Sequence, residues 1–171
     1  MPDQRVEWIP FLNEVFRKQG IYKDGNGYKW AENDSAPLTP LSKPVKECRI
    51  ALTSGCGARL KSQPIWEKEE RKDPGWRDDI SFREIPKDTK FSDVVITAAT
   101  HSYDSEMDPN IMIPLDRMKE MEEGSYFRER APYYFTHHGT WRRGKLVRET
   151  VPKMVQRFRE MEVDAVISFA Q

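Results

Sequence analysis

Short runs of apolar residues with few charges recur along the chain at wide intervals. Residues 48–53 form the first run, which ends in the glycine turn 54–57, and residues 94–99 and 165–170 form two more. Residues 82–85 form a fourth, weaker run. Runs of this length beside turn residues are typical of buried strands. The pattern therefore predicts three buried strands and one weaker strand.

Between these runs, apolar residues recur every three or four positions, which indicates amphipathic helices. Residues 114–124 form one, with Pro114 in its first turn and Gly124 just past its end. Residues 147–162 form a second, with an apolar face made of Val151, Met154, Val155, Phe158 and Met161. A third helix is expected at residues 8–16, ahead of a stretch containing prolines and glycines that predicts an extended arm.

Apolar strands that alternate with helices predict an α/β fold, a parallel twisted sheet with flanking helices in three layers, Rossmann-like or flavodoxin-like. We expect residues 1–45 to form an N-terminal helical arm and residues 46–171 to form the α/β domain. The last predicted strand stands directly at the end of the chain. We therefore expect either an edge strand there or a domain that is incomplete at its C-terminus.

Composition narrows the classes of partner. The 28 Lys and Arg residues balance 28 Asp and Glu residues, so no net charge favours nucleic acid or an anionic membrane. The chain has no apolar run long enough to span a membrane and no signal-peptide pattern at its amino end, which predicts a cytoplasmic protein. The two cysteines, Cys48 and Cys56, are then expected to be free thiols.

Side chains that could take part in catalysis follow two of the predicted strands. His101, Tyr103 and Asp104 offer an acid or base, a phenol and a carboxylate directly after the strand at residues 94–99. In a parallel sheet this loop and the turn at Ser54 would share one edge, where sites commonly form. The alternative is that the aspartates of this loop cap turns while His101 bonds to backbone.

Cys56 lies in a glycine turn that could present backbone N–H groups to an anion and lower the pKa of a thiol. The alternative, an inert packed thiol, is favoured because no second cysteine stands at redox-motif spacing. We expect no metal site, since the neighbours His137 and His138 point to opposite faces of an extended segment. The glycine turn also lacks the dinucleotide-binding fingerprint.

Several of these segments resemble a known family. Residues 57–64 and 81–86 resemble two successive blocks of the selenoprotein B subunits of the glycine/sarcosine/betaine/D-proline reductase family. The loop at residues 101–104, followed by residues 108–110 and 113–117, resembles the histidine–tyrosine–aspartate loop and helix start of that family. The resemblance runs from Arg49 to Gln171, and its block at residues 60–63 is most like the D-proline branch.

The resemblance implies a subunit of a reductase that reductively cleaves an amino acid or amine such as D-proline, glycine, sarcosine or betaine. A dithiol is the electron donor, a selenolate attacks the α-carbon, and a pyruvoyl group on a partner subunit holds the amine. It implies that His101, Tyr103 and Asp104 are catalytic residues besides the selenocysteine. Cys56 is a further catalytic candidate, the nucleophile to be tested if the chain itself shows activity. It implies that the substrate-binding residues are Ser54, Gly55, Asp108 and Asn110.

In that family the selenocysteine, or a cysteine in its place, follows a strand like residues 165–170. We therefore expect it just after Gln171, with no cofactor in the chain itself, and expect the chain as given to be truncated and inactive alone. We also expect it to form oligomers. The alternative function is a non-catalytic α/β domain that binds a small carboxylate or a partner subunit.

Overall fold

A computed structural model describes residues 39–66, 79–97, 107–138 and 143–169 of the chain. The helix predicted at residues 8–16, and all but the end of the predicted arm, lie outside these residues. The division of the chain at residue 45 therefore stays a prediction.

The main sheet is built around β1 (Arg49–Ser54). On one side β1 pairs in parallel with β7 (Ala165–Phe169), and on the other with β5 (Glu129–Arg130) and then β6 (Tyr133–His137). The remaining strand, β3 (Phe82–Pro86), runs antiparallel along β6. The strands predicted at residues 48–53, 82–85 and 165–170 are therefore confirmed in one sheet, in which the strand at residues 82–85 runs antiparallel.

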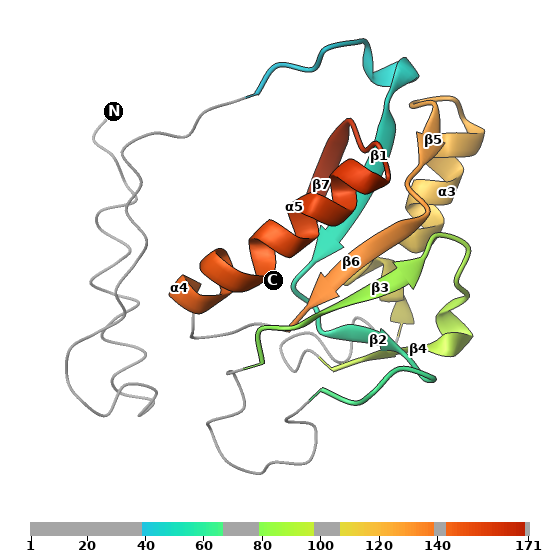
Figure 1. The fold of residues 1–171 in the computed structure, drawn as a ribbon. Helices are drawn as coiled ribbons and strands as arrows, with labels where there is room; N and C mark the ends of the chain where they lie inside the picture. The colour runs from blue at the N-terminus through green and yellow to red at the C-terminus, as the bar shows by residue number, and fades with distance from the viewer. Residues whose placement is uncertain (1–38, 67–78, 98–106, 139–142, 170–171) are drawn as a thin grey trace, which may run out of the picture. The chain divides into compact units, whose positions relative to one another are not determined.

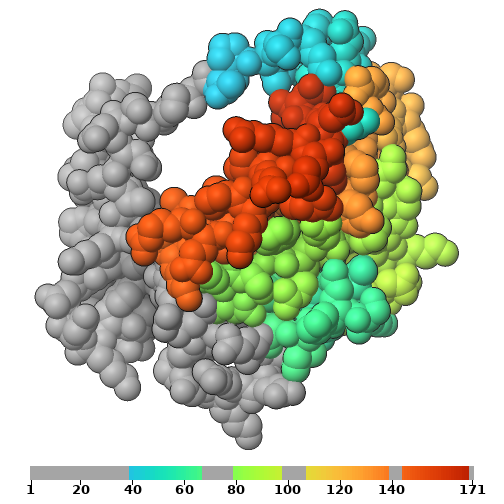
Figure 2. All heavy atoms as spheres, viewed as in Figure 1, coloured from blue at the N-terminus to red at the C-terminus, as the bar shows by residue number. Residues whose placement is uncertain are grey.

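Helices cover both faces of this sheet, as Figure 1 shows. One face carries α3 (Leu115–Glu123), which Pro114 precedes and Gly124 ends as the sequence predicts. The other carries α4 (Arg143–Lys145), a π-helical turn (Leu146–Thr150) and α5 (Val151–Glu160), which form one continuous ridge in Figure 2. The three-layer α/β fold is therefore confirmed.

Alternation along the strands separates the core into two clusters. Ile50 and Leu52 of β1 point to the α3 face, where they pack with Met118 and other buried residues. Phe135 of β6 points to the α5 face and stacks on Phe158, with ring centroids 4.4 Å apart. A bidentate ion pair from Arg157 of α5 to Glu84 of β3 ties the same helix to the sheet.

One predicted strand belongs elsewhere. The run at residues 94–99 was expected in the parallel sheet, but β4 (Val94–Ile96) pairs antiparallel with β2 (Ala58–Leu60) in a separate two-stranded sheet. The turn after β1 sends the chain directly into β2, which gives β4 a nearby partner. The placement of that run in the parallel sheet was therefore wrong, and β2, β5 and β6 were not predicted.

Single-turn 3-10 helices complete the described chain and lie at Val45–Glu47, Phe91–Asp93 and Pro109–Ile111.

A buried cation joins α3 to the sheet. The side chain of Arg130 in β5 is 5% exposed and donates to Glu122 at 2.7 Å and Asp88 at 2.8 Å. Its third donor binds the carbonyl of Lys87 at 2.7 Å, and its backbone N–H also donates to Glu122, at 2.7 Å. Burial raises the pKa of Glu122, but the hydrogen bonds and charge of Arg130 outweigh it and hold that pKa below its ordinary value.

Replacement of Glu122 by Gln should destabilise the protein by about 2 kcal/mol at pH 7. Both carboxylate oxygens accept from Arg130, whereas Gln has one acceptor oxygen, so one hydrogen bond is lost and the other loses its charge. The folded pKa of Glu122 lies below its ordinary value of 4.5. Its stabilisation is therefore present above pH 4.5 and is lost as the pH falls through the folded pKa. Urea unfolding at a series of pH values should show the difference between wild type and E122Q shrinking in acid.

The neighbouring Glu123→Gln change is the matched control. Glu123 is 65% exposed on its side chain and lies 3.9 Å from Lys119, so its loss should change stability by less than about 0.5 kcal/mol. Equal destabilisation by both changes would contradict the role given to Arg130.

Candidate functional site

The parallel strands β1, β6 and β7 end together at one edge of the sheet. The N–H of Gly55, just after β1, donates to the carbonyl of Phe169 at 3.2 Å. The N–H of Gly57 donates to the carbonyl of His137 at 2.9 Å, and Cys56 bridges to His138. Backbone hydrogen bonds thus join the ends of all three strands, at the edge where α/β proteins bind ligands.

Ser54 has a structural task at this edge. Its side chain is buried, its hydroxyl donates to the carbonyl of Met112 at 2.7 Å, and its oxygen accepts from the N–H of Cys56 at 3.3 Å. These bonds connect the end of β1 to the segment that leads into α3. The proposed part of Ser54 and Gly55 in substrate binding stays a prediction.

Gly57 packs closely against Thr97 and His138 at this edge. Gly57 has φ +62°, and a Cβ built there would lie 2.6 Å from Oγ1 of Thr97 and 2.8 Å from Cδ2 of His138. The carbonyl of Gly57 accepts from Trp66 Nε1 at 2.8 Å and from Thr97 Oγ1 at 2.9 Å. The buried His138 ring also meets Trp66 edge-on, with centroids 5.9 Å apart.

His138 was considered at the sequence level only as a metal ligand and was set aside. A histidine directly after a strand in a parallel sheet is the signal that could have marked it as a residue of the edge. Among the described residues, no group of three or more His, Cys, Asp or Glu side chains could hold a metal ion.

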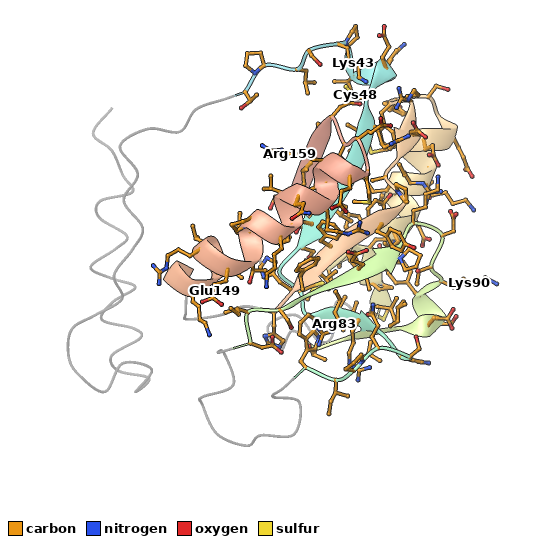
Figure 3. The ribbon with its side chains drawn as sticks, viewed as in Figure 1. Lys43, Cys48, Arg83, Lys90, Glu149 and Arg159 are labelled. Carbon is orange, nitrogen blue, oxygen red and sulfur yellow. The ribbon has the colours of Figure 1, made fainter. Side chains whose placement is uncertain are left out.

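The environment of Cys56 fits a packing role. The residue is fully buried, and this burial raises the pKa of its thiol above the ordinary value despite hydrogen bonds from its surroundings. A buried thiol with a raised pKa carries little thiolate at neutral pH. Cys48 lies at the opposite end of β1, near Lys43 in Figure 3, so the two thiols are at different ends of the strand.

His101, Tyr103 and Asp104 lie outside the described residues. Thr97 is the last described residue before their loop, and its hydroxyl contact with Gly57 places it at the carboxyl edge. His101 follows Thr97 by only four residues in the sequence. The expectation that this loop belongs to the edge stays a prediction, although β4 itself lies outside the main sheet.

A cavity of about 460 Å³ opens between α3 and the end of β7. Asp108 and Asn110, both predicted to bind substrate, line it together with Arg117. The other walls are Ile111, Pro114, Met118, Met121, Ile167 and Phe169. The cavity therefore combines apolar walls with one carboxylate, one amide and one guanidinium group.

A compact network holds the polar wall of the cavity. Oδ1 of Asp108 accepts from the N–H of Asn110 at 3.0 Å and from its Nδ2 at 2.9 Å. The amide oxygen of Asn110 accepts in turn from the N–H of Asp116 at 3.0 Å, at the start of α3. The hydrogen bonds from Asn110, and the charge of Arg117, lower the pKa of Asp108 below its ordinary value, so the carboxylate is ionised at neutral pH.

The family model for glycine/sarcosine/betaine reductase selenoprotein B matches residues 27–170. The chain belongs to this family. No curated protein and no solved structure matches the chain. Selenoprotein B reductases work in multi-subunit complexes, which indicates partner subunits for this chain as well. Within the described residues, no helix is long and apolar enough to cross a membrane.

For this selenoprotein B chain, the packing at Gly57 predicts that Gly57→Ala destabilises the fold. A positive φ costs a non-glycine residue about 1–2 kcal/mol, and the new methyl group would also overlap Thr97 and His138. We expect a total loss of about 2–4 kcal/mol in urea unfolding.

Gly144→Ala provides the control for this change. Gly144 lies in α4 and has no positive φ, and its nearest neighbour there is the flexible end of Arg148 at 3.2 Å. Alanine should be neutral or stabilise the helix by up to about 1 kcal/mol. Similar stability of both variants would show that the contact between Gly57 and His138 is loose.

Proposed function

We propose that this chain is the substrate-cleaving subunit of a reductase that acts on a small amino acid or amine such as glycine, sarcosine, betaine or D-proline. The observation that carries the proposal is the match to the selenoprotein B family over residues 27–170, a range that includes every strand of the sheet. The cavity beside β7 supports it, since cavities at the carboxyl edge of such sheets are common ligand sites.

The proposed reaction breaks the bond between the α-carbon and the nitrogen of the substrate. The amine leaves with the electron pair of that bond, and the α-carbon receives two electrons and one proton. A dithiol supplies both electrons and becomes a disulfide. Its second proton is released to solvent or to the leaving amine, which completes the balance.

The family resemblance implies which groups would break the bond between the α-carbon and the nitrogen. A selenocysteine, or a cysteine in its place, after β7 would supply the nucleophile for the α-carbon, and a pyruvoyl group on a partner subunit would hold the amine. The cavity fits this arrangement, because Phe169 of β7 forms part of its wall. The 171 residues contain no selenocysteine, so we expect no turnover from the chain by itself.

The chain's own residues would bind the substrate and move a proton. Asp108 and Asn110 line the cavity, and the ionised Asp108 is suited to hold a cationic nitrogen. We propose that His101, with Tyr103 and Asp104, delivers a proton to the leaving amine.

The proposal is tested with the subunit produced together with its partner subunits and purified as a complex. Glycine, sarcosine, betaine and D-proline are each supplied with a dithiol, and the released amine, or ring-opened acid for D-proline, is measured against disulfide formed. One disulfide per cleaved bond supports the proposal. Failure to cleave all four substrates would favour the non-catalytic binding domain.

Turnover by the purified 171-residue chain would contradict our expectation for it. Cys56 would then be the nucleophile to test, although it is buried in the structure. Cys56→Ser would have to abolish that activity, and a retained rate would exclude the thiol.

In the active complex, His101→Gln should lower kcat by about 10²–10⁴-fold, the contribution of a positioned acid. The loss should diminish at low pH, where solvent can protonate the amine. His137→Gln is the matched control, because alternation along β6 puts this side chain on the α5 face, away from the cavity. Equal rates for wild type and H101Q would show that the loop containing His101 has only a structural role.

A further inference from the structure

We infer that the outer edge of β7 pairs antiparallel with β7 of a second copy of this chain, so that two sheets join into one across a two-fold axis. The inference goes beyond the proposed function, because it concerns how copies of the chain assemble and requires no turnover. Three features of the described chain support it: the free main-chain groups of β7, the apolar surface on both faces of the strand, and the distribution of charge around it.

The first feature is the free edge of β7. Among the described strands β7 pairs only with β1, and it is the last strand of the sheet on that side (Figure 1). The carbonyl of Phe169 accepts from Gly55, which places the main-chain groups of Phe169, and by alternation those of Ile167, on the β1 side. The N–H and C=O groups of Val166 and Ser168 therefore point outward, where no described residue binds them.

The sequence of β7 suits pairing with itself. An antiparallel pair centred on Ile167 puts Val166 of each copy opposite Ser168 of the other. The main-chain groups of Val166 and Ser168 point outward, so each of these two pairs can exchange both of its hydrogen bonds. Ile167 then meets Ile167 of the second copy as a non-hydrogen-bonded pair, and the small Ala165 lies opposite the large Phe169.

β7 carries none of the features that keep an edge strand from pairing. Such strands are commonly protected by Lys, Pro, a β-bulge or an inward-pointing charge. The five residues of β7 are Ala, Val, Ile, Ser and Phe, and they pair with β1 in an unbroken register. The strand is therefore built like an interior strand, which needs a second neighbour.

The second feature is the apolar surface on both faces of β7. On the α5 face, the side chain of Val166 is 41% exposed. On the α3 face, Ile167 and Phe169 line the cavity beside α3, which is open to solvent and mostly apolar. A second copy of β7 would cover the free edge and bring its own Ile167 to the open side of that cavity. Burial of this apolar surface favours association.

The third feature is charge, which does not oppose contact between two copies. The chain has as many acidic as basic residues, and β7 itself has no charged side chain. At the cavity, the exposed Asp108 and Arg117 carry opposite charges. A two-fold axis turns such a surface onto itself, so Arg117 of one copy can approach Asp108 of the other. Asp164, next to the strand, is already held by Lys43 at 2.8 Å.

The expected dimer is weak, because a single pair of strand edges buries less than the ~1,200 Å² of a standard interface. Sedimentation velocity of the full 171-residue chain should show monomers at low concentration and dimers at high concentration. In the same samples, exchange of the Val166 and Ser168 amide hydrogens should slow as dimers form. Exchange at Ile167, whose N–H already faces β1, should stay unchanged. A monomer at every concentration would overturn the inference.

Two substitutions block the edge without touching the pairing with β1. Ser168→Pro removes an outward N–H, a place where edge strands tolerate proline, and should weaken the dimer about tenfold or more. Val166→Lys puts a charge on a side chain that is already exposed and should also weaken the dimer, with the backbone unaltered.

Val147→Lys is the matched control for these substitutions. Val147 is 60% exposed in the π-helical turn before α5, outside the edge of β7, so a lysine there should leave the dimer unchanged. Circular dichroism checks that all three variants fold. Equal dimerisation of V166K and V147K would show that the copies meet through another surface, which contradicts the inference.

A disulfide cross-link tests the antiparallel register. Opposite residues of a non-hydrogen-bonded pair have Cα atoms about 4.5 Å apart, within reach of a disulfide. Ile167→Cys should therefore give a covalent dimer on mild oxidation. Ala165→Cys is its control, because the two introduced thiols would lie roughly 14 Å apart along the strands. The native Cys48 and Cys56 are buried and should not take part.

Equal cross-linking by I167C and A165C would overturn the register. In the complex with partner subunits, a cross-link from I167C to one of those subunits would assign the edge to that subunit. Loss of the cross-link when the chain is extended past Gln171 would assign the edge to the chain's own continuation. Either result overturns pairing with a second copy.

The proposed function fails or stands separately. A complex that cleaves a substrate while its β7 edge stays unpaired refutes only the pairing. A dimer through β7 in a complex that cleaves none of the four substrates refutes only the reductase assignment.

Discussion

The structure depends on parallel pairing of β1 with strands on both sides. Ile50 to Ser54 pair residue by residue with Ala165 to Phe169, while the other side of β1 meets β5 at its start and β6 at its end. The sequence separation of these partners is large, so the sheet depends on non-local contacts between segments joined by long crossover connections. The register of this pairing determines which strand ends lie together at an edge of the sheet. It also determines which side chains face each helical layer.

The two ends of β1 are stabilised by different means. At the amino end, the N–H of Arg49 donates to Asp164 at 2.7 Å, Asp164 pairs with Lys43 at 2.8 Å, and Arg49 pairs with Glu129 at 3.1 Å. At the carboxyl end, backbone hydrogen bonds and the close packing around Gly57 replace these ion pairs. Charged side chains thus close the amino end, and the described cavity opens where β7 ends.

The carboxyl edge and the cavity beside it are built from different groups. The backbone connections between strand ends position the edge without using the walls of the cavity, which come from side chains of α3, its preceding turn and β7. Asp108 and Arg117 supply opposite charges to the cavity, and apart from Asn110 apolar residues form the rest of its wall.

The sequence by itself determined the strands near residues 48–53 and 165–170 and the helices at 114–124 and 147–162, because burial leaves a periodic pattern in a single segment. The resemblance of several segments to the selenoprotein B subunits indicated the family, and it pointed to Asp108 and Asn110 as candidate substrate-binding residues. Only tertiary structure decided that β4 pairs with β2, that the short β5 and β6 flank β1, and that His138 packs on Gly57. It alone showed the cavity and the burial that raises the pKa of Cys56. These features depend on contacts between residues far apart in the chain, which no local pattern records.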